Sequence, residues 1–160
     1  MELQILRRPW VEDSHLPATL PPRLRQIYAT RGVSSAAELE KATQSLLPPS
    51  GLLGIEQGIR LLASALEQQR RILIVGDFDA DGATSSALCV LALRAMGGRH
   101  VDFLVPNRFE YGYGLSPEIV ALAIERGAEL LLTVDNGISS LSGVEAARAA
   151  GMQVIVTDHH

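Results

Sequence analysis

The fold is decided by one stretch of the chain, residues 72–82, which reads Ile-Leu-Ile-Val-Gly-Asp-Phe-Asp-Ala-Asp-Gly. Its first four residues form a continuous apolar run, which is typical of a strand that is buried on both faces. The run ends in an acidic loop that contains glycine, and the small, mostly apolar residues 83–96 then predict a helix. The stretch therefore predicts a buried strand, a polar loop at its carboxyl end and a crossover helix.

The same order of strand and helix recurs further along the chain. Residues 101–105, 130–134 and 154–157 are further apolar runs of strand length, and helices are predicted between them. Apolar strands that alternate with helices predict an α/β fold, with a parallel sheet of at least four strands and helices on both faces.

The residues before this region have a different pattern, without long apolar runs. Prolines punctuate short helical segments, and Pro48-Pro49-Ser50-Gly51 is the clearest break. We therefore predict a small helical N-terminal segment over residues 1–50 and an α/β domain over residues 51–160.

Composition limits the class of protein. The 160 residues are 47% hydrophobic and 20% charged, as in ordinary globular domains. No apolar run approaches the roughly 18 residues that cross a bilayer, and the N-terminus lacks a signal-peptide pattern. The single cysteine, Cys89, excludes an internal disulfide and a cysteine zinc site. We expect a cytoplasmic protein that does not associate with a membrane.

The carboxylates are concentrated in the second part of the chain. Residues 72–160 contain five Arg against eleven Asp and Glu, and several of these carboxylates follow predicted strands. Because parallel strands end at the same edge of a sheet, these polar groups should meet in one crevice. The expected members are Asp77, Asp79, Asp81, Asp135, Asp158, His159 and His160.

Carboxylates packed this closely repel one another and need either raised pKa values or bound cations. Oxygen ligands with one or two imidazoles suit Mn²⁺, and Mg²⁺ is also compatible. There are enough ligands for two ions about 3.5–4 Å apart that share a bridging carboxylate. Hydrolysis of a phosphoester or phosphoanhydride is the reaction class that such a pair favours.

Other sites with similar motifs fit less well. An EF-hand calcium loop that begins at Asp77 would need Glu at its twelfth position, where Leu88 stands. A dinucleotide loop would need G-x-G-x-x-G, and acidic residues there would repel pyrophosphate. A Walker A loop fails because the only lysine in the chain is Lys41.

Five motifs, in this order, carry a resemblance to a known family: LPPRLRQIYATRGV, VGDFDADGATSSAL, VPNRFEYGYGLSPEIV, TVDNGIS and VIVTDHH. Together they resemble the DHH phosphoesterase superfamily, which is named for the tripeptide at residues 158–160. Within it, the chain is similar to the N-terminal part of the RecJ family of single-stranded-DNA-specific 5′→3′ exonucleases. The resemblance implies two-metal phosphodiester hydrolysis in DNA recombination and repair.

The resemblance also implies roles for the acidic motifs. Asp79 and Asp81 resemble direct metal ligands, and Asp77 supports or joins them. Asp135 resembles the carboxylate that bridges both ions, and His159 a ligand to one ion.

Other residues are expected to act on the substrate or on the ligands. His160 is expected to face the scissile phosphate. The expected catalytic residues are His160 and all the metal ligands except Asp77. Asp158 is expected to orient the DHH motif. Asn136 and Arg108 are candidates for phosphate contact. The aromatic residues of segment 107–114 are compatible with either packing or base stacking.

RecJ proteins are several times longer and carry a further aspartate ligand, a second domain and an OB-like domain. We therefore expect this chain to be an N-terminal fragment that is weakly active or inactive alone. The expected partners are single-stranded DNA and, by resemblance, single-strand binding protein and a RecQ-type helicase. Two alternatives stay open: a DHH-type phosphodiesterase on oligoribonucleotides or cyclic dinucleotides, and a non-catalytic binding module.

Overall fold

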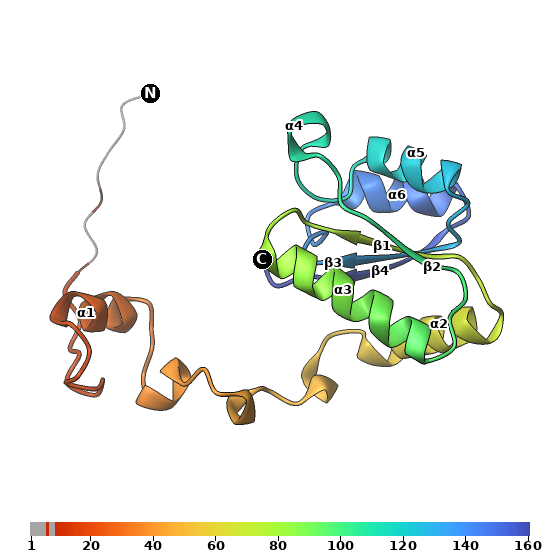
Figure 1. Cartoon of the computed structure of the whole chain (residues 1–160). Helices are drawn as coiled ribbons and strands as arrows, with labels where there is room; N and C mark the ends of the chain where they lie inside the picture. Colours follow the sequence, from red (N-terminus) through yellow and green to blue (C-terminus); the bar gives the residue numbers. More distant parts are fainter. Residues whose placement is uncertain (1–5, 7–8) are drawn as a thin grey trace. The chain divides into compact units, whose positions relative to one another are not determined.

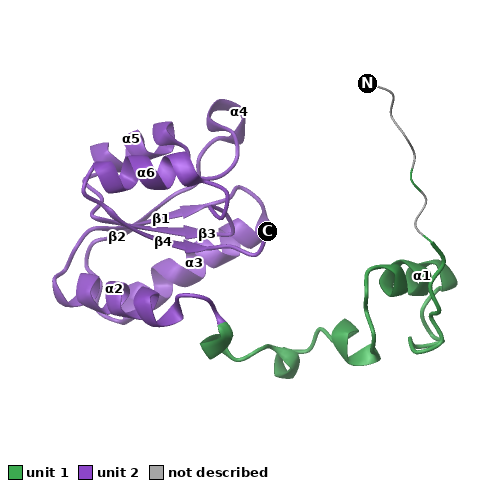
Figure 2. Cartoon of the chain, turned by 180° about the vertical axis from the view of Figure 1, so that it is seen from behind, with its two compact units in different colours: residues 1–51 green, residues 52–160 purple. Residues whose placement is uncertain are grey.

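The computed structural model describes Leu6 and residues 9–160, and Figure 1 shows its elements. The chain divides into two compact units, residues 1–51 and 52–160, which Figure 2 shows in different colours. Each unit is described by itself below.

In its described residues, the first unit has one α-helix and three short 3₁₀ turns. The helix α1 (Pro22–Thr30) begins with proline at its first position, where the missing N–H costs no hydrogen bond. The turns η1 (Ala36–Leu39), η2 (Thr43–Ser45) and η3 (Pro49–Gly51) follow. The predicted helical character of this segment is confirmed.

The second unit is built on a four-stranded sheet in the order β2-β1-β3-β4. Its strands are β1 (Ile72–Gly76), β2 (Val101–Leu104), β3 (Leu130–Val134) and β4 (Gln153–Thr157). Every neighbouring pair is parallel. The predicted parallel α/β sheet is therefore confirmed.

Helices cover both faces of the sheet. The helices α2 (Ile55–Glu67) and α3 (Ala80–Ala95) lie on one face, and α5 (Pro117–Glu125) and α6 (Leu141–Ala149) lie on the other (Figure 1). A one-turn helix, α4 (Arg108–Tyr111), lies in the connection from β2 to α5.

Alternate residues of β1 face opposite layers, which explains why its sequence is apolar throughout. Ile72 and Ile74 pack in the core beneath α2 and α3, whereas Leu73 and Val75 pack in the core beneath α5 and α6. All four side chains are almost fully buried, and each contributes about 1.5–3 kcal/mol of burial free energy.

The strand order places a topological switch point between β1 and β3. From β1 the chain crosses by α3 to β2 on one side, whereas β3 continues by α6 to β4 on the other side. The loops that follow β1 and β3 therefore diverge and leave a crevice at the carboxyl edge, where open α/β sheets bind ligands. Within the described part of the chain, no helix is long and apolar enough to span a bilayer.

Candidate metal centre

The loop after β1 turns directly into α3 and gives its aspartates different positions. Asp79 is the N-cap of α3, and its Oδ1 accepts hydrogen bonds from the N–H groups of Asp81 (3.1 Å) and Gly82 (3.0 Å). The Gly82 N–H is the main cause of the lowered pKa of Asp79. A Cβ atom on Gly82 would lie 2.4 Å from the backbone oxygen of Asp77, so only glycine fits this tight turn.

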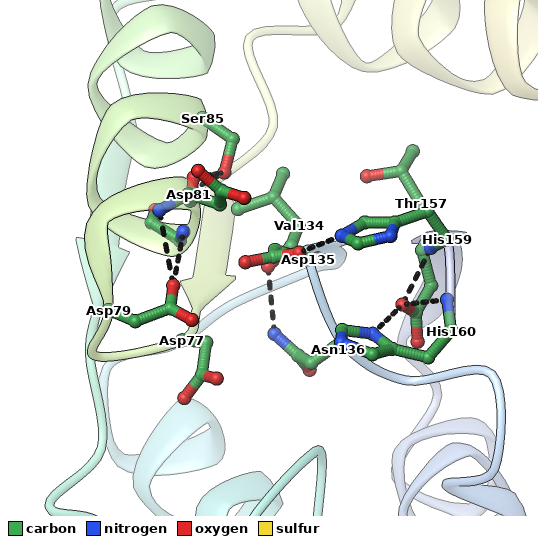
Figure 3. A network of polar contacts seen from close by, with 12 residues as sticks. Asp77, Asp79, Asp81, Ser85, Val134, Asp135, Asn136, Thr157, His159 and His160 are labelled. Atoms are coloured by element: carbon green, nitrogen blue, oxygen red, sulfur yellow. Dashed lines mark hydrogen bonds and ion pairs between the residues drawn. The ribbon is translucent and has the colours of Figure 1, made fainter. Parts of the chain in front are cut away.

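Asp81 lies in the first turn of α3 and points toward the carboxyl ends of β3 and β4 (Figure 3). Among the described residues, its carboxylate has no hydrogen-bond or ion-pair partner. It lines an open hollow of about 290 Å³ together with Asp135, His159 and residues of β3 and β4. Asp81 therefore offers both carboxylate oxygens to a ligand in this hollow.

Asp135 follows β3 at the switch point and is the most enclosed carboxylate of the motif loops after β1 and β3. It is 9% exposed, and its backbone has φ of 63°, a left-handed conformation that is uncommon for residues other than glycine. Its Oδ1 lies 2.8 Å from Nε2 of His159.

The DHH motif follows β4 and is held by its own aspartate. The side chain of Asp158 is 2% exposed, and it accepts hydrogen bonds from the Ile138 N–H (2.9 Å) and from Nδ1 of His160 (2.6 Å). Burial acts to raise the pKa of Asp158, but these hydrogen bonds outweigh burial and lower the pKa to about 2. The same contact with Asp158 raises the pKa of His160.

These side chains fit a divalent cation. Potential ligand atoms of Asp135, His159 and His160 all lie within 4.8 Å of one another, and the rings of the two histidines stack at 4.5 Å. The free carboxylate of Asp81 faces the same hollow as Asp135 and His159. Carboxylate oxygens combined with imidazole nitrogen are compatible with Mn²⁺, and the oxygens alone with Mg²⁺.

Two residues expected to contact phosphate are already engaged in other contacts. Asn136 is 2% exposed, and its Nδ2 donates to the backbone oxygens of Val75 (3.0 Å) and Val134 (2.9 Å). Its N–H donors thus join β1 to β3 and are not free for a phosphate group. Nη2 of Arg108 lies 2.9 Å from Oδ2 of Asp77, so these two residues form a pair beside the hollow rather than within its lining.

Tyr113 is a site residue for which the sequence offered only packing or base stacking. Its hydroxyl group donates to the backbone oxygen of Asp135 (3.2 Å) and lies 3.0 Å from Nδ1 of His160. The signal for this contact was its place in the loop between β2 and α5, because that loop starts at the same sheet edge. Of the other aromatic residues there, Tyr111 packs on the core and Phe109 is fully exposed.

A second hollow, of about 240 Å³, lies at the amino ends of β1 and β2. Its lining includes Arg71, Arg99, His100 and Arg126. It contains none of the predicted site residues, and it lies at the opposite end of the strands from the carboxylates. The candidate centre is therefore the hollow at the carboxyl edge.

Comparison with known proteins places this geometry in a family. Residues 71–160, which include the whole sheet and the three acidic motifs, match the DHH family, N-terminal domain. The chain belongs to the DHH family. This membership confirms the first resemblance, because the match covers more than half of the chain.

Relatives within the DHH family carry the RecJ name. The chain is 57% identical over 159 residues to the single-stranded-DNA-specific exonuclease RecJ of Escherichia coli (strain K12), and the match covers 99% of this chain and 28% of that protein. It is 38% identical over 153 residues to the protein of the same name from Thermus thermophilus, and that match covers 89% of this chain and 23% of the relative. The chain thus spans about a quarter of the length of these relatives.

Solved structures agree with the sequence matches. A crystal structure of exonuclease RecJ bound to manganese matches 71% of this chain and 28% of its own, at 42% identity and a TM-score of 0.64. The crystal structure of RecJ from Thermus thermophilus in complex with Mn²⁺ matches 83% of this chain and 18% of its own, at 35% identity and a TM-score of 0.61.

Proposed function

We propose that this chain holds the metal-binding half of the active site of a single-stranded-DNA-specific exonuclease that works in the 5′→3′ direction. The observation that carries the proposal is the convergence of Asp81, Asp135, His159 and His160 at the β1/β3 switch point. The RecJ names of its relatives supply the substrate and the manganese ion. Magnesium is compatible with the same oxygen ligands.

Each residue of the centre has a proposed task. Asp81, Asp135 and His159 would hold the cation, and Asp79 would fix the turn that presents Asp81 while joining as a further ligand. A bound divalent ion would supply positive charge to the phosphodiester oxygens and would activate water near neutral pH. Asp135 would bridge two ions, because its Oδ1 contacts His159 and it lines the same hollow as Asp81.

His160 is placed to act on the phosphate. Its Nδ1 is used by Asp158 and Tyr113, which leaves Nε2 as the nitrogen that is available to substrate. Because Asp158 raises the pKa of His160, the imidazole holds its second proton to higher pH and can donate it to a phosphate oxygen.

Metal binding is the first test, because it depends only on the residues of the centre and requires no turnover. We expect calorimetry to detect Mn²⁺ binding that Asp81→Asn weakens by at least about tenfold. Asp102→Asn is the matched control, since Asp102 pairs with Arg126 away from the centre and should leave the affinity unchanged. Absence of Mn²⁺ binding by the wild-type chain would contradict the proposal.

Degradation of 5′-labelled single-stranded DNA is the second test. Loss of label that requires both Mn²⁺ and Asp81 supports the exonuclease. Binding of the ion without any degradation leaves the metal-binding proposal standing, whereas failure to bind Mn²⁺ favours the non-catalytic module. Faster hydrolysis of dinucleotides than of long single-stranded DNA favours the small-substrate phosphodiesterase. The cytoplasmic location and the partnership with single-strand binding protein and a RecQ-type helicase stay predictions that rest on the sequence.

A further inference from the structure

Asp77 differs from the other two aspartates of its loop because both of its oxygens already have partners. Oδ1 accepts a hydrogen bond from the Phe78 N–H (2.8 Å), and Oδ2 pairs with Nη2 of Arg108 (2.9 Å). The side chain is only 11% exposed, and it lies outside both the cation cluster and the lining of the hollow. Asp77 is therefore less well placed than Asp81 to ligate a metal ion in the hollow.

Arg108 is held on three sides. Besides the ion pair with Asp77, its guanidinium carbon lies 4.1 Å from the centre of the Phe78 ring and 5.2 Å from the centre of the Tyr113 ring. Tyr113 in turn donates a hydrogen bond to the backbone of Asp135. A stacked and paired guanidinium loses little further side-chain entropy when it binds a ligand.

The guanidinium nevertheless keeps most of its donors. Among the described residues, the Arg108 guanidinium donates a hydrogen bond only to Asp77, and the side chain is 43% exposed. The remaining N–H groups form a planar fork, which matches the oxygens of a phosphate group. The ring of Tyr113 lies against the guanidinium, and its hydroxyl group contacts both Asp135 and His160, so the fork lies next to the centre where the scissile phosphate is expected.

We propose that Asp77 is a positioning residue that acts through Arg108: with Phe78 and Tyr113 it fixes the guanidinium to receive a phosphate group of the substrate. This inference rests on the proposed phosphodiester substrate, and it replaces the expectation that Asp77 supports or joins the metal ligands. The proposal predicts the direction in which the affinity for a polyanion changes. Removing a carboxylate from this acidic region should strengthen the binding of a polyanion by simple electrostatics, whereas loss of the positioned guanidinium should weaken it.

The test compares Asp77→Asn with Asp81→Asn and with the control Asp102→Asn, which removes another Asp–Arg pair and the same charge. Two affinities are measured by calorimetry: that for Mn²⁺ alone, and that for a 5′-phosphorylated oligothymidylate with hydrolysis-resistant phosphorothioate linkages. We expect Asp77→Asn to keep Mn²⁺ affinity within about twofold and to weaken oligonucleotide binding by roughly tenfold, the range of a hydrogen bond to a charged group. Asp81→Asn should lose Mn²⁺ affinity, and Asp102→Asn should change neither.

A double-mutant cycle then separates action through Arg108 from a general structural effect. In an Arg108→Gln background, Asp77→Asn should cause no further loss of oligonucleotide affinity. Additive losses of oligonucleotide affinity in the double variant overturn the proposal. It is also overturned if Asp77→Asn loses Mn²⁺ affinity, or if it binds the oligonucleotide as tightly as the wild type or more tightly. Absence of oligonucleotide binding by the wild type overturns it as well. None of these affinities requires turnover, so they test the role of Asp77 separately from the proposed activity. A chain that binds both ligands but degrades no DNA leaves the role of Asp77 intact.

Discussion

The amide of Asn136 joins the two central strands, and its removal should cost far more stability than its size suggests. Nδ2 donates to Val75 at the end of β1 and to Val134 at the end of β3, at 3.0 and 2.9 Å, in a site that is 2% exposed. Asn136→Ala removes both hydrogen bonds and leaves these two backbone oxygens without that donor.

The expected loss follows from these two bonds. Each contributes about 0.5–1.5 kcal/mol, so the substitution should lower the free energy of unfolding by about 2–3 kcal/mol once the buried carbonyl groups are included. For a unit of this size, that corresponds to a fall of roughly 10 °C in melting temperature. Mn²⁺ affinity should fall as well, because Asp135, the preceding residue, is in the left-handed conformation and loses a neighbour that fixes its backbone.

Urea and thermal unfolding, followed by circular dichroism at the helix band, measure this loss. Asn107→Ala is the matched control, because it removes the same atoms from an exposed residue whose Oδ1 caps the short helix α4. The control should cost no more than about 1 kcal/mol. If Asn136→Ala costs no more than Asn107→Ala, the amide does not join the strands, and its assignment as a phosphate contact becomes the better explanation.

Two further predictions concern the loops around the centre. The pKa of Asp158 is lowered from 3.8 to about 2, so the stabilisation that its carboxylate provides is lost as the pH falls toward 2. The pKa of His160 is raised above 6.5, so the stabilisation from its protonated ring is lost as the pH rises through the raised pKa. In the metal-free chain, the destabilisation caused by Asp158→Asn should therefore be greatest between about pH 4 and 6.5 in urea unfolding, and a difference that is constant from pH 3 to 9 would contradict this. Gly82→Ala should lower the free energy of unfolding by more than about 2 kcal/mol, because the new Cβ would lie 2.4 Å from the Asp77 oxygen. Gly58→Ala, in α2 with its nearest atom at 3.9 Å, should raise it by up to about 1 kcal/mol in the same denaturant titration, and equal effects would refute the steric argument.

The fold could be predicted from the sequence because each strand corresponds to an apolar run that is followed by polar residues. Residues 72–76 and 130–134 form strands where the runs predict them. The strand order could not be predicted in the same way. Both faces of the central strands are apolar, so the pattern does not indicate which strands are neighbours. The structure places β1 between β2 and β3.

The candidate site was predictable in its membership but not in the division of roles. The parallel topology alone brings the endings of β1, β3 and β4 to one edge. The sequence pattern, however, predicts that the helix after β1 begins at residue 83, whereas α3 begins at Ala80. This difference of three residues makes Asp79 the N-cap and places Asp81 in the first helical turn, which a loop assignment for residues 77–82 could not show.

The remaining capacity for hydrogen bonding separates residues that can bind a ligand from residues that only hold the site together. Nδ2 of Asn136 donates to two backbone oxygens, and each carboxylate oxygen of Asp77 already has a partner. The carboxylate of Asp81 accepts no hydrogen bond from a described residue, and the guanidinium of Arg108 donates only one. A sequence motif cannot show this distinction, because aspartates two residues apart look equivalent until the turn that separates them is known. The same criterion leads us to expect that substitutions at Asp81 change what the site binds, whereas substitutions at Asn136 change whether the sheet edge forms at all.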